Sequence, residues 1–126
     1  EKITYYSRKP KAGDIVVIKY PSDTRKNFIK RVIAVGGDKL KIVNGNLYIN
    51  GRLKNESYIF EKMNSYIDEN FEKEVTIPKG TIFVMGDNRN DSDDSRFKDV
   101  GFVKLNLVVG KAFIRIFPFT RFGRVK

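Results

Sequence analysis

Residues 40–51 read Leu-Lys-Ile-Val-Asn-Gly-Asn-Leu-Tyr-Ile-Asn-Gly, two short apolar runs that are each followed by Asn-Gly. Asn and Gly both accept the positive φ that a type I′ turn needs at its two central positions. A strand that meets such a turn folds back on itself as an antiparallel hairpin. The stretch therefore predicts two tight hairpins in succession.

Similar strand signals lie on both sides of this stretch. They are short runs rich in Val, Ile, Leu and Phe that are bounded by turn residues, which is typical of antiparallel strands. The predicted strands are residues 15–18, 27–35, 40–43, 47–49, 81–85, 107–109 and 111–117. Residues 55–74 are polar with weak periodicity and are predicted to form a long excursion. No stretch has a convincing helical pattern, so the chain 1–126 is predicted to be one all-β domain.

The composition indicates a globular domain and excludes several kinds of chemistry. Hydrophobic residues make up 40% of the 126 positions and aromatic residues 13%, which is typical of a chain that buries a core. The sequence contains no Cys and no His. A histidine base, a thiol nucleophile and a metal site of thiolate or imidazole ligands are therefore excluded. No apolar run approaches the roughly 18–20 residues of a membrane-spanning helix, and no signal peptide is visible.

The formal net charge of +10 is distributed unevenly along the chain. Residues 1–54 carry 13 basic and 4 acidic side chains, residues 55–110 carry 7 and 11, and residues 111–126 carry 5 and none. A basic surface of this kind fits an anionic partner, either a lipid headgroup layer or a nucleic acid. Solvated lysines that protect exposed strand edges are the alternative explanation. The charge pattern alone leaves both open.

Lys30 stands out because it interrupts the apolar run 28–35. Strand periodicity places it on the same face as Phe28, Val32 and Ala34. Burial among apolar neighbours lowers a lysine pKa from its usual value near 10.4, and a lysine at about 7–8 can act as a general base at neutral pH. The alternative is a strand-edge lysine whose amine reaches water. A lysine base also needs a Ser or Thr hydroxyl within hydrogen-bond reach, and spacing alone selects none.

Residues 86–96 form a dense polar segment, Gly-Asp-Asn-Arg-Asn-Asp-Ser-Asp-Asp-Ser-Arg. Asp, Asn, Gly and Ser are turn residues, so a plain surface loop is one explanation. A calcium loop is another, but Arg89 or Arg96 falls where that pattern needs a ligand or a glycine. In extended geometry Ser92, Asp94 and Arg96 project to one side, which allows a carboxylate–guanidinium pair beside a hydroxyl.

Three stretches together resemble the bacterial type I signal peptidases, serine–lysine endopeptidases that remove signal peptides from exported proteins. Residues 13–17, Gly-Asp-Ile-Val-Val, look like the family's first strand motif. Residues 30–33, Lys-Arg-Val-Ile, with Gly-Asp at 37–38, look like the stretch that carries its general-base lysine. Residues 86–96 match its closing motif, GDNRxxSxDSR, at every fixed position. The resemblance extends from about residue 13 to about residue 117, and the last motif is highly specific.

The resemblance implies roles for individual residues. Lys30 would take the proton of the serine nucleophile and later activate the deacylating water, and Ser92 would bond to its amine and orient it. Asp94 and Arg96 would form a salt bridge that braces the loop. The turn beside the site would be shaped by Gly86, Asp87 and Asn88.

The resemblance also implies a fold, a substrate and a location. The antiparallel sheets would form a conical or partly open barrel with little helix. The strand before the lysine would pair with the extended substrate, and the pockets for its small side chains would be lined by Asn27, Phe28 and Ile29. No metal or cofactor would be needed. The partners would be signal-peptide-bearing preproteins at a membrane surface, not nucleic acid, and an anchor of one or a few spans would hold the domain on the extracytoplasmic side.

Two departures from the family pattern have consequences. The family's nucleophile lies in a motif of the form SMxPT soon after a membrane anchor, and this sequence contains no such motif. The serine segment, with part of the oxyanion hole, is therefore expected before Glu1, and the chain on its own is expected to be inactive. Gly36 stands where members often carry proline. It is expected to loosen the turn after the base strand without touching a proton-transfer group.

The C-terminal residues 113–126 interleave Phe with Arg and Lys. Phe113 and Phe117 are expected either in the core or on an aromatic–basic rim that rests on anionic lipid headgroups. A face of this kind could also bind single-stranded nucleic acid.

Three other functions stay open behind the signal peptidase. The first is an autoproteolytic domain of the SOS-repressor type, which uses the same serine–lysine chemistry. The second is a non-catalytic homologue that assists the assembly or folding of exported surface subunits. The third is a basic β-barrel that binds nucleic acid, for which salt-dependent oligonucleotide binding would be the sign.

Overall fold

The computed structural model describes residues 2–4, 8–56, 71–90 and 92–113. Within these ranges the chain forms ten strands and a short 3₁₀ helix. Their bounds are β1 (Lys2–Thr4), β2 (Ile15–Tyr20), β3 (Asp23–Val35), β4 (Lys39–Val43), β5 (Asn46–Ile49), β6 (Arg52–Leu53), β7 (Val75–Thr76), β8 (Thr81–Met85), β9 (Val103–Lys104), η2 (Leu105–Leu107) and β10 (Val108–Phe113). None of the helical structure in the described ranges has the length and apolar character of a membrane span.

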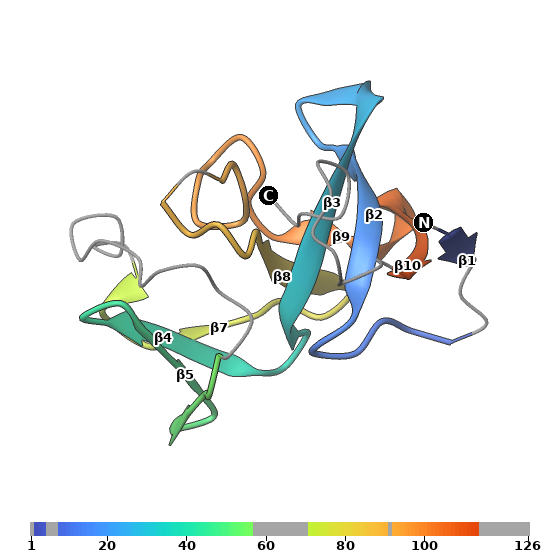
Figure 1. The fold of residues 1–126 in the computed structure, drawn as a ribbon. Helices are drawn as coiled ribbons and strands as arrows, with labels where there is room; N and C mark the ends of the chain where they lie inside the picture. Colours follow the sequence, from blue (N-terminus) through green and yellow to red (C-terminus); the bar gives the residue numbers. More distant parts are fainter. Residues whose placement is uncertain (1, 5–7, 57–70, 91, 114–126) are drawn as a thin grey trace.

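The strands form two open antiparallel sheets (Figure 1). The larger sheet has the order β1-β10-β2-β3-β8-β9, and the smaller one has the order β6-β5-β4-β7. The prediction of an all-β fold of antiparallel sheets is confirmed. Among the described strands no pairing joins β1 to β9, so the larger sheet is not closed into a barrel. Instead the chain leaves the larger sheet after β3, builds the smaller sheet and returns at β8.

β3 has 13 residues, and its two halves have different neighbours. β2 pairs with β3 from Asp23 to Arg31. β8 pairs with β3 on the opposite side, but only from Arg31 to Val35. The β2–β3 hairpin therefore projects from the sheet, at the top of Figure 1. In the described part of the chain no strand covers the outer edge of residues 23–30.

The two predicted Asn-Gly turns are present in the smaller sheet. Asn44 and Gly45 have φ values of 50° and 77°, and Asn50 and Gly51 have values of 53° and 81°. Positive φ at both central residues is the signature of the type I′ turn. The turns join β4 to β5 and β5 to β6, with the pairing that the sequence predicts.

β3 contributes to two separate apolar clusters. Val32 packs in one and Ala34 in the other, because the register with β8 shifts between these residues. The first cluster is formed by Val16, Ile18, Val32, Ile82, Val84, Val100 and Val103. The second is formed by Ile33, Ala34, Leu40, Ile42, Leu47, Ile77, Phe83 and Met85. The predicted period of two therefore holds from Phe28 to Val32 and fails at Ala34, since a bulge inserts one extra residue.

Gly36 lies where the chain leaves β3, against the turn that precedes β8. A Cβ at this position would lie 3.0 Å from the Cα of Lys79 and 3.0 Å from the carbonyl oxygen of Pro78. The adjacent Gly37 donates a backbone hydrogen bond of 2.8 Å to Ile77. The expectation that Gly36 loosens this turn is corrected: here a glycine allows two backbones to approach closely.

The C-terminal strand differs from the prediction. β10, which begins at Val108, replaces the separate strands predicted at 107–109 and 111–117. It pairs with β2 across a register shift at Gly110, which accounts for the break in the sequence pattern. Phe113 is 50% exposed and lies with its ring 5.4 Å from Lys111 Nζ, so it is not a core residue.

Some of the predictions fall outside the described residues. They include most of the excursion 55–74, of which 57–70 are not described, and all of 114–126 with Phe117. Three strands that the sequence pattern missed, β1, β7 and β9, have three or two residues each. Strands this short present no periodicity to detect.

Candidate active site

Lys30 lies in the outer half of β3, opposite Val16 of β2, and only 3% of it is exposed. Its Nζ donates a hydrogen bond of 2.9 Å to Ser92 Oγ. The same Nζ lies 5.4 Å from the centre of the Phe28 ring. The structure thus brings Lys30 and Ser92 together from positions 62 residues apart. A buried amine that bonds to a hydroxyl is placed for proton transfer.

The loop that carries Ser92 is bonded to β8 and to itself. Ser95 Oγ accepts a hydrogen bond of 2.9 Å from Val84 N, and Ser95 N donates one of 3.0 Å to Val84 O. Asp94 Oδ2 accepts a hydrogen bond of 3.0 Å from Gly86 N. These bonds fix both ends of the segment around Ser92.

Asp94 and Arg96 form a two-bonded ion pair inside this loop. Arg96 Nε donates to Asp94 Oδ1 at 2.8 Å, and Arg96 Nη2 donates to Asp94 Oδ2 at 2.9 Å. Both side chains are fully buried. Parallel hydrogen bonds between a guanidinium and a carboxylate fix orientation as well as distance. Residues expected to brace the loop are therefore in contact, two positions from Ser92.

A second pair joins the loop to the strand that carries Lys30. Arg31 donates from Nε to Asp87 Oδ1 at 2.9 Å and from Nη2 to Asp87 Oδ2 at 2.8 Å. The guanidinium also donates to the carbonyl oxygen of Gly13 at 3.3 Å. Sequence analysis placed Asp87 in the turn but missed its partner. The available signal was that Arg31 directly follows the lysine in an otherwise apolar strand.

A third pair is buried at the base of the same turn. Arg89 donates to the two carboxylate oxygens of Glu56 at 2.8 and 2.6 Å, and its Nε donates to Gly86 O at 2.8 Å. Asn88 is half-buried next to it. No sequence signal pointed to Glu56, which is separated from Arg89 by 33 positions.

The residues expected to bind substrate lie on the projecting half of β3. Asn27 is exposed, whereas Phe28 and Ile29 are half-buried. Their backbones pair with β2 on one side, and the uncovered edge described above lies on the other. The ring of Phe28 stacks on that of Tyr20 with 4.7 Å between the ring centres. These three residues lead directly to Lys30 along one strand.

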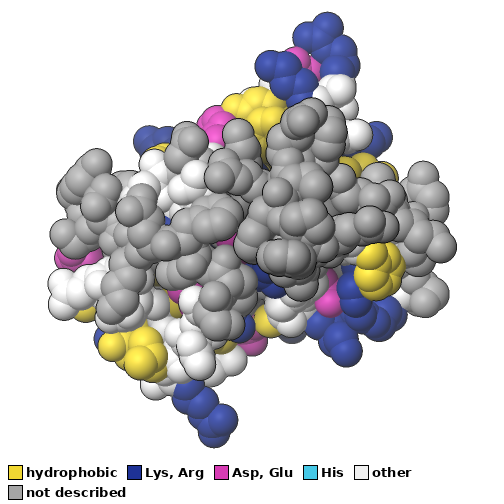
Figure 2. All heavy atoms as spheres, viewed as in Figure 1, with side chains coloured by type: hydrophobic (Ala, Val, Ile, Leu, Met, Phe, Trp, Pro, Cys, Tyr) yellow, Lys and Arg dark blue, Asp and Glu magenta, His cyan; other side chains and the backbone are white. Residues whose placement is uncertain are grey.

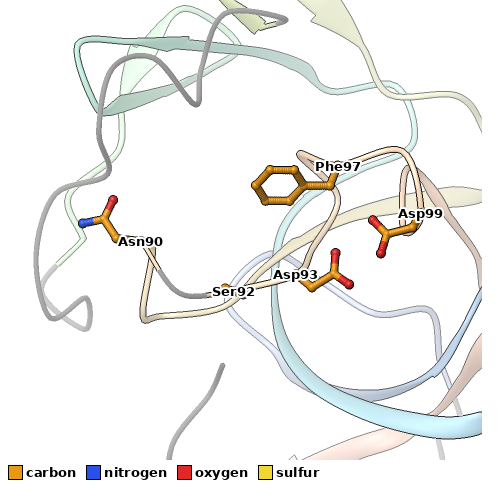
Figure 3. Close-up of a pocket in the computed structure, with 5 residues that line it drawn as sticks. All are labelled: Asn90, Ser92, Asp93, Phe97 and Asp99. Carbon is orange, nitrogen blue, oxygen red and sulfur yellow. The ribbon is translucent and has the colours of Figure 1, made fainter.

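A hollow of about 410 Å³ lies beside Ser92. Figure 3 shows its lining residues, Asn90, Ser92, Asp93, Phe97 and Asp99. Burial, followed by the hydrogen bond with Asp99, raises the pKa of Asp93 to about 6. The hydrogen bond with Asp93 lowers the pKa of Asp99. Within the described ranges no group of three or more His, Cys, Asp or Glu residues is arranged to hold a metal ion.

Comparison with known proteins adds a family to this geometry. A family model described as signal peptidase, peptidase S26, matches residues 1–117. The chain belongs to the signal peptidase S26 family. The match covers both β3 with Lys30 and the loop with Ser92, so the two parts of the site lie inside it.

Several individual proteins named as signal or processing peptidases are similar to this chain. "Probable signal peptidase I-1" of Synechocystis sp. is 37% identical over 99% of this chain, and thylakoidal processing peptidase 1 of Arabidopsis thaliana is 34% identical over 94%. The chain spans 64% and 36% of the lengths of these two proteins. The crystal structure of a signal peptidase I from Enterococcus faecalis V583 superimposes with a TM-score of 0.69 at 33% identity, covering 84% of this chain and 98% of that one.

Sequence analysis missed the acidic part of this site. Asp93 and Asp99 lie in or near a polar loop where single carboxylates carry no periodic signal. Tyr20 lies almost eighty positions away, and only the fold shows that its hydroxyl donates a hydrogen bond to Asp99.

Proposed function

We propose that this chain is the catalytic domain of a type I signal peptidase, an endopeptidase that removes signal peptides from exported preproteins. One observation carries the proposal. The buried amine of Lys30, bonded to Ser92, lies next to a strand edge that no described strand covers. Membership of the signal peptidase S26 family supports the same chemistry.

Lys30 acts as the general base in this mechanism. Burial disfavours the ammonium form, so the amine is available to take a proton from a serine hydroxyl. Ser92 orients the amine through its hydrogen bond. The attacking serine belongs to a motif of the SMxPT type, which the 126 residues do not contain. Its attack on the scissile carbonyl breaks the peptide bond and forms an acyl-enzyme, and Lys30 gives the proton it has taken to the departing amine. The neutral Lys30 then takes a proton from the water that hydrolyses the ester.

The substrate binds as an added strand along the outer edge of β3. An uncovered edge presents backbone N–H and C=O groups that pair with an extended peptide. Asn27, Phe28 and Ile29 lie on this edge. The alternation of side chains along a strand then directs every second substrate residue toward the pockets that these residues line. A peptide paired along this edge has its scissile bond close to Lys30.

The ion pairs set the geometry of the two reacting elements. Arg31, which adjoins Lys30, is held by Asp87 at the start of the loop. Asp94, near Ser92, is held by Arg96. A proton-transfer site needs atoms held within a fraction of an ångström, and paired charges provide this because they fix direction and distance.

The proposal places the domain at the extracytoplasmic surface of a membrane. Figure 2 shows Lys and Arg side chains gathered at the top of the molecule, where Figure 1 has the tip of the β2–β3 hairpin. The exposed cations of this hairpin are Lys19, Arg25 and Lys26. Basic side chains near a membrane are attracted to anionic headgroups by about 1 kcal/mol each. The tip is therefore suited to rest on lipid beside the peptide-binding edge.

The test replaces the proposed base in the protein that includes the serine segment. Lys30→Ala, and Lys30→Met, which preserves side-chain volume, should lower the cleavage rate of a signal-peptide substrate by about 10²–10⁴-fold or more. Lys39→Ala is the matched control, because Lys39 is an exposed strand lysine that lies on β4 of the smaller sheet, away from the substrate edge and the hairpin tip. Thermal unfolding of each variant separates loss of chemistry from loss of fold.

Two results would overturn the proposal. Full cleavage by folded Lys30→Met would show that another group is the base. A wild-type protein that folds and binds a signal peptide but does not cleave it would support the non-catalytic homologue instead.

A further inference from the structure

Two carboxyl groups lie close to Lys30 and Ser92 but have no part in the proposed proton transfer. They belong to Asp93, the residue after Ser92, and to Asp99, and we call them the acid pair. Figure 3 shows the two carboxyl groups facing one another at the side of the hollow. Burial and the interaction with Asp99 raise the pKa of Asp93, and the same interaction lowers the pKa of Asp99, which is the behaviour of two neighbouring carboxyl groups that hold one proton between them.

The acid pair is also bonded to the β2–β3 hairpin. The hydroxyl of Tyr20, at the end of β2, donates a hydrogen bond to Asp99 Oδ2. Ser22 Oγ donates a second bond, of 2.8 Å, to the backbone oxygen of Asp99. The acid pair therefore bridges two elements, the loop that carries Ser92 and the hairpin that carries the uncovered edge.

These contacts form a continuous ring of interactions that begins and ends at Lys30, the proposed base. Lys30 Nζ bonds to Ser92 and lies beside the ring of Phe28. Phe28 stacks on Tyr20, and Tyr20 bonds to the acid pair, whose first member follows Ser92 in the chain. If the loop moved away from the hairpin, either the bond within the acid pair or the bond to Tyr20 would break.

We propose that the acid pair is a positioning element of the peptidase, which holds the Ser92 loop against the β2–β3 hairpin and sets the negative charge beside Lys30. The proposal rests on the function proposed for Lys30. The family motif GDNRxxSxDSR does not assign this role, because the position of Asp93 is one of its unspecified positions. Asp99 lies outside the motif.

The charged groups around the acid pair determine how it responds to pH. Burial and the neighbouring Asp99 raise the pKa of Asp93 to about 6. The ammonium of Lys30 favours the ionised form of Asp93, and the carboxylate of Asp94 opposes it. Bonds from Asp93 and Tyr20 lower the pKa of Asp99. Below pH of about 6 the acid pair thus carries one negative charge, and above it the pair carries two.

Ionisation of Asp93, which gives the acid pair its second negative charge, has two effects. It removes the shared proton, so the two carboxylates repel one another and the bridge weakens. It also stabilises the ammonium of Lys30, since an interaction between two titrating groups acts on both. Protonated Asp93 therefore favours the closed bridge and the neutral amine together.

The sign of the stability effect follows from the raised pKa. Between the ordinary value of 3.8 and about 6, folded Asp93 binds its proton more tightly than it does in the unfolded chain. The contribution of this group to stability therefore falls as pH rises through that window.

Asp93→Asn tests the proposal, because asparagine keeps a hydrogen-bond donor for Asp99 and never acquires the second charge. The readout is the titration of the Lys30 ε-methylene in the chain labelled with ¹³C-lysine, assigned by loss of the signal in Lys30→Met. The Lys30 midpoint should fall by roughly half to one pH unit. The decline of Tm between pH of about 4 and about 6 should also become shallower than in wild type.

Glu74→Gln is the control, because it removes one negative charge from an exposed position on the smaller-sheet side. It should leave the Lys30 titration and the pH dependence of Tm unchanged. A second variant, Tyr20→Phe, keeps the stacked ring and removes the hydroxyl. It should raise the titration midpoint of the Asp99 carboxyl carbon.

The outcomes separate this inference from the function it rests on. If Asp93→Asn behaves like Glu74→Gln in both readouts, the positioning role of the acid pair is overturned while Lys30 can remain the base. If wild-type Lys30 titrates like exposed Lys26, its role as the base is overturned, and a shift in Asp93→Asn still supports the acid pair.

Discussion

The smaller sheet and the loop 86–96 are held together by different forces. In the described part of the smaller sheet the fully buried side chains are apolar, with Leu40, Ile42 and Leu47 at the centre. The loop instead buries four charged side chains, those of Asp87, Arg89, Asp94 and Arg96. Apolar burial is non-directional, whereas paired charges fix geometry. The comparison indicates that this chain buries charged side chains, despite their desolvation cost, in the loop that holds Ser92 Oγ within hydrogen-bond distance of Lys30 Nζ.

The largest effect is expected from breaking the pair inside the loop. Asp94→Ala removes the carboxylate that pairs with the fully buried guanidinium of Arg96, and breaking a buried ion pair by removing one partner costs about 3–5 kcal/mol of unfolding free energy. Urea denaturation measures this loss. Asp23→Ala is the control, because its partner Arg25 is exposed at the hairpin tip and ion pairs in contact with water contribute little to stability. Equal losses in the two variants would remove the distinction between the regions.

A substitution in the core of the smaller sheet is expected to lower stability by a similar amount but to leave the cleavage rate unchanged. Ile42→Ala creates a cavity in the second cluster and should cost about 2–5 kcal/mol. Because Ile42 lies on β4 of the smaller sheet, whereas the proposed site is built on β3 and the loop 86–96, the cleavage rate per folded molecule should equal that of wild type. Leu53→Ala, at an exposed position of β6, should change neither quantity. A lower rate in folded Ile42→Ala would show that the two regions are coupled.

A smaller effect on stability, but a specific one on rate, is expected at Ser92. Ser92→Ala removes the hydrogen bond to Lys30 Nζ, and bonds to charged or ionisable groups contribute about 1.5–3 kcal/mol. The cleavage rate should therefore fall about 10- to 100-fold. Ser95→Ala removes the bond to Val84 instead and should lower stability more than rate. Loss of activity in Ser92→Ala as complete as in Lys30→Ala would mean that Ser92 is itself the nucleophile.

The regions also differ in how well the sequence predicts them. The hairpins at 40–51 follow from local chemistry, since Asn-Gly sets the turn and the turn sets the register. The contact between Lys30 and Ser92 was expected only because two motifs, 62 positions apart, resemble one family. Their roles in catalysis stay predictions. No local rule would have paired them.

Other features lay beyond any pattern of single residues. The bulge between Val32 and Ala34 depends on how β8 packs against β3, so strict alternation mispredicted Ala34. The ion pair of Arg89 with Glu56 and the bond from Tyr20 to Asp99 depend on segments that meet only in the folded chain. Long-range partners of single polar side chains leave no periodic trace in sequence.

The close approach at Gly36 determines how this architecture tolerates changes in length. The smaller sheet begins and ends at the same place, because Asp38 O accepts a backbone hydrogen bond of 2.8 Å from Ile77 N, just past Gly36. Everything between those two residues is an insertion whose ends are already joined. Extra residues added at the Asn44-Gly45 turn would lengthen the far end of this module. They would leave the register between β3, which carries Lys30, and β8 unchanged.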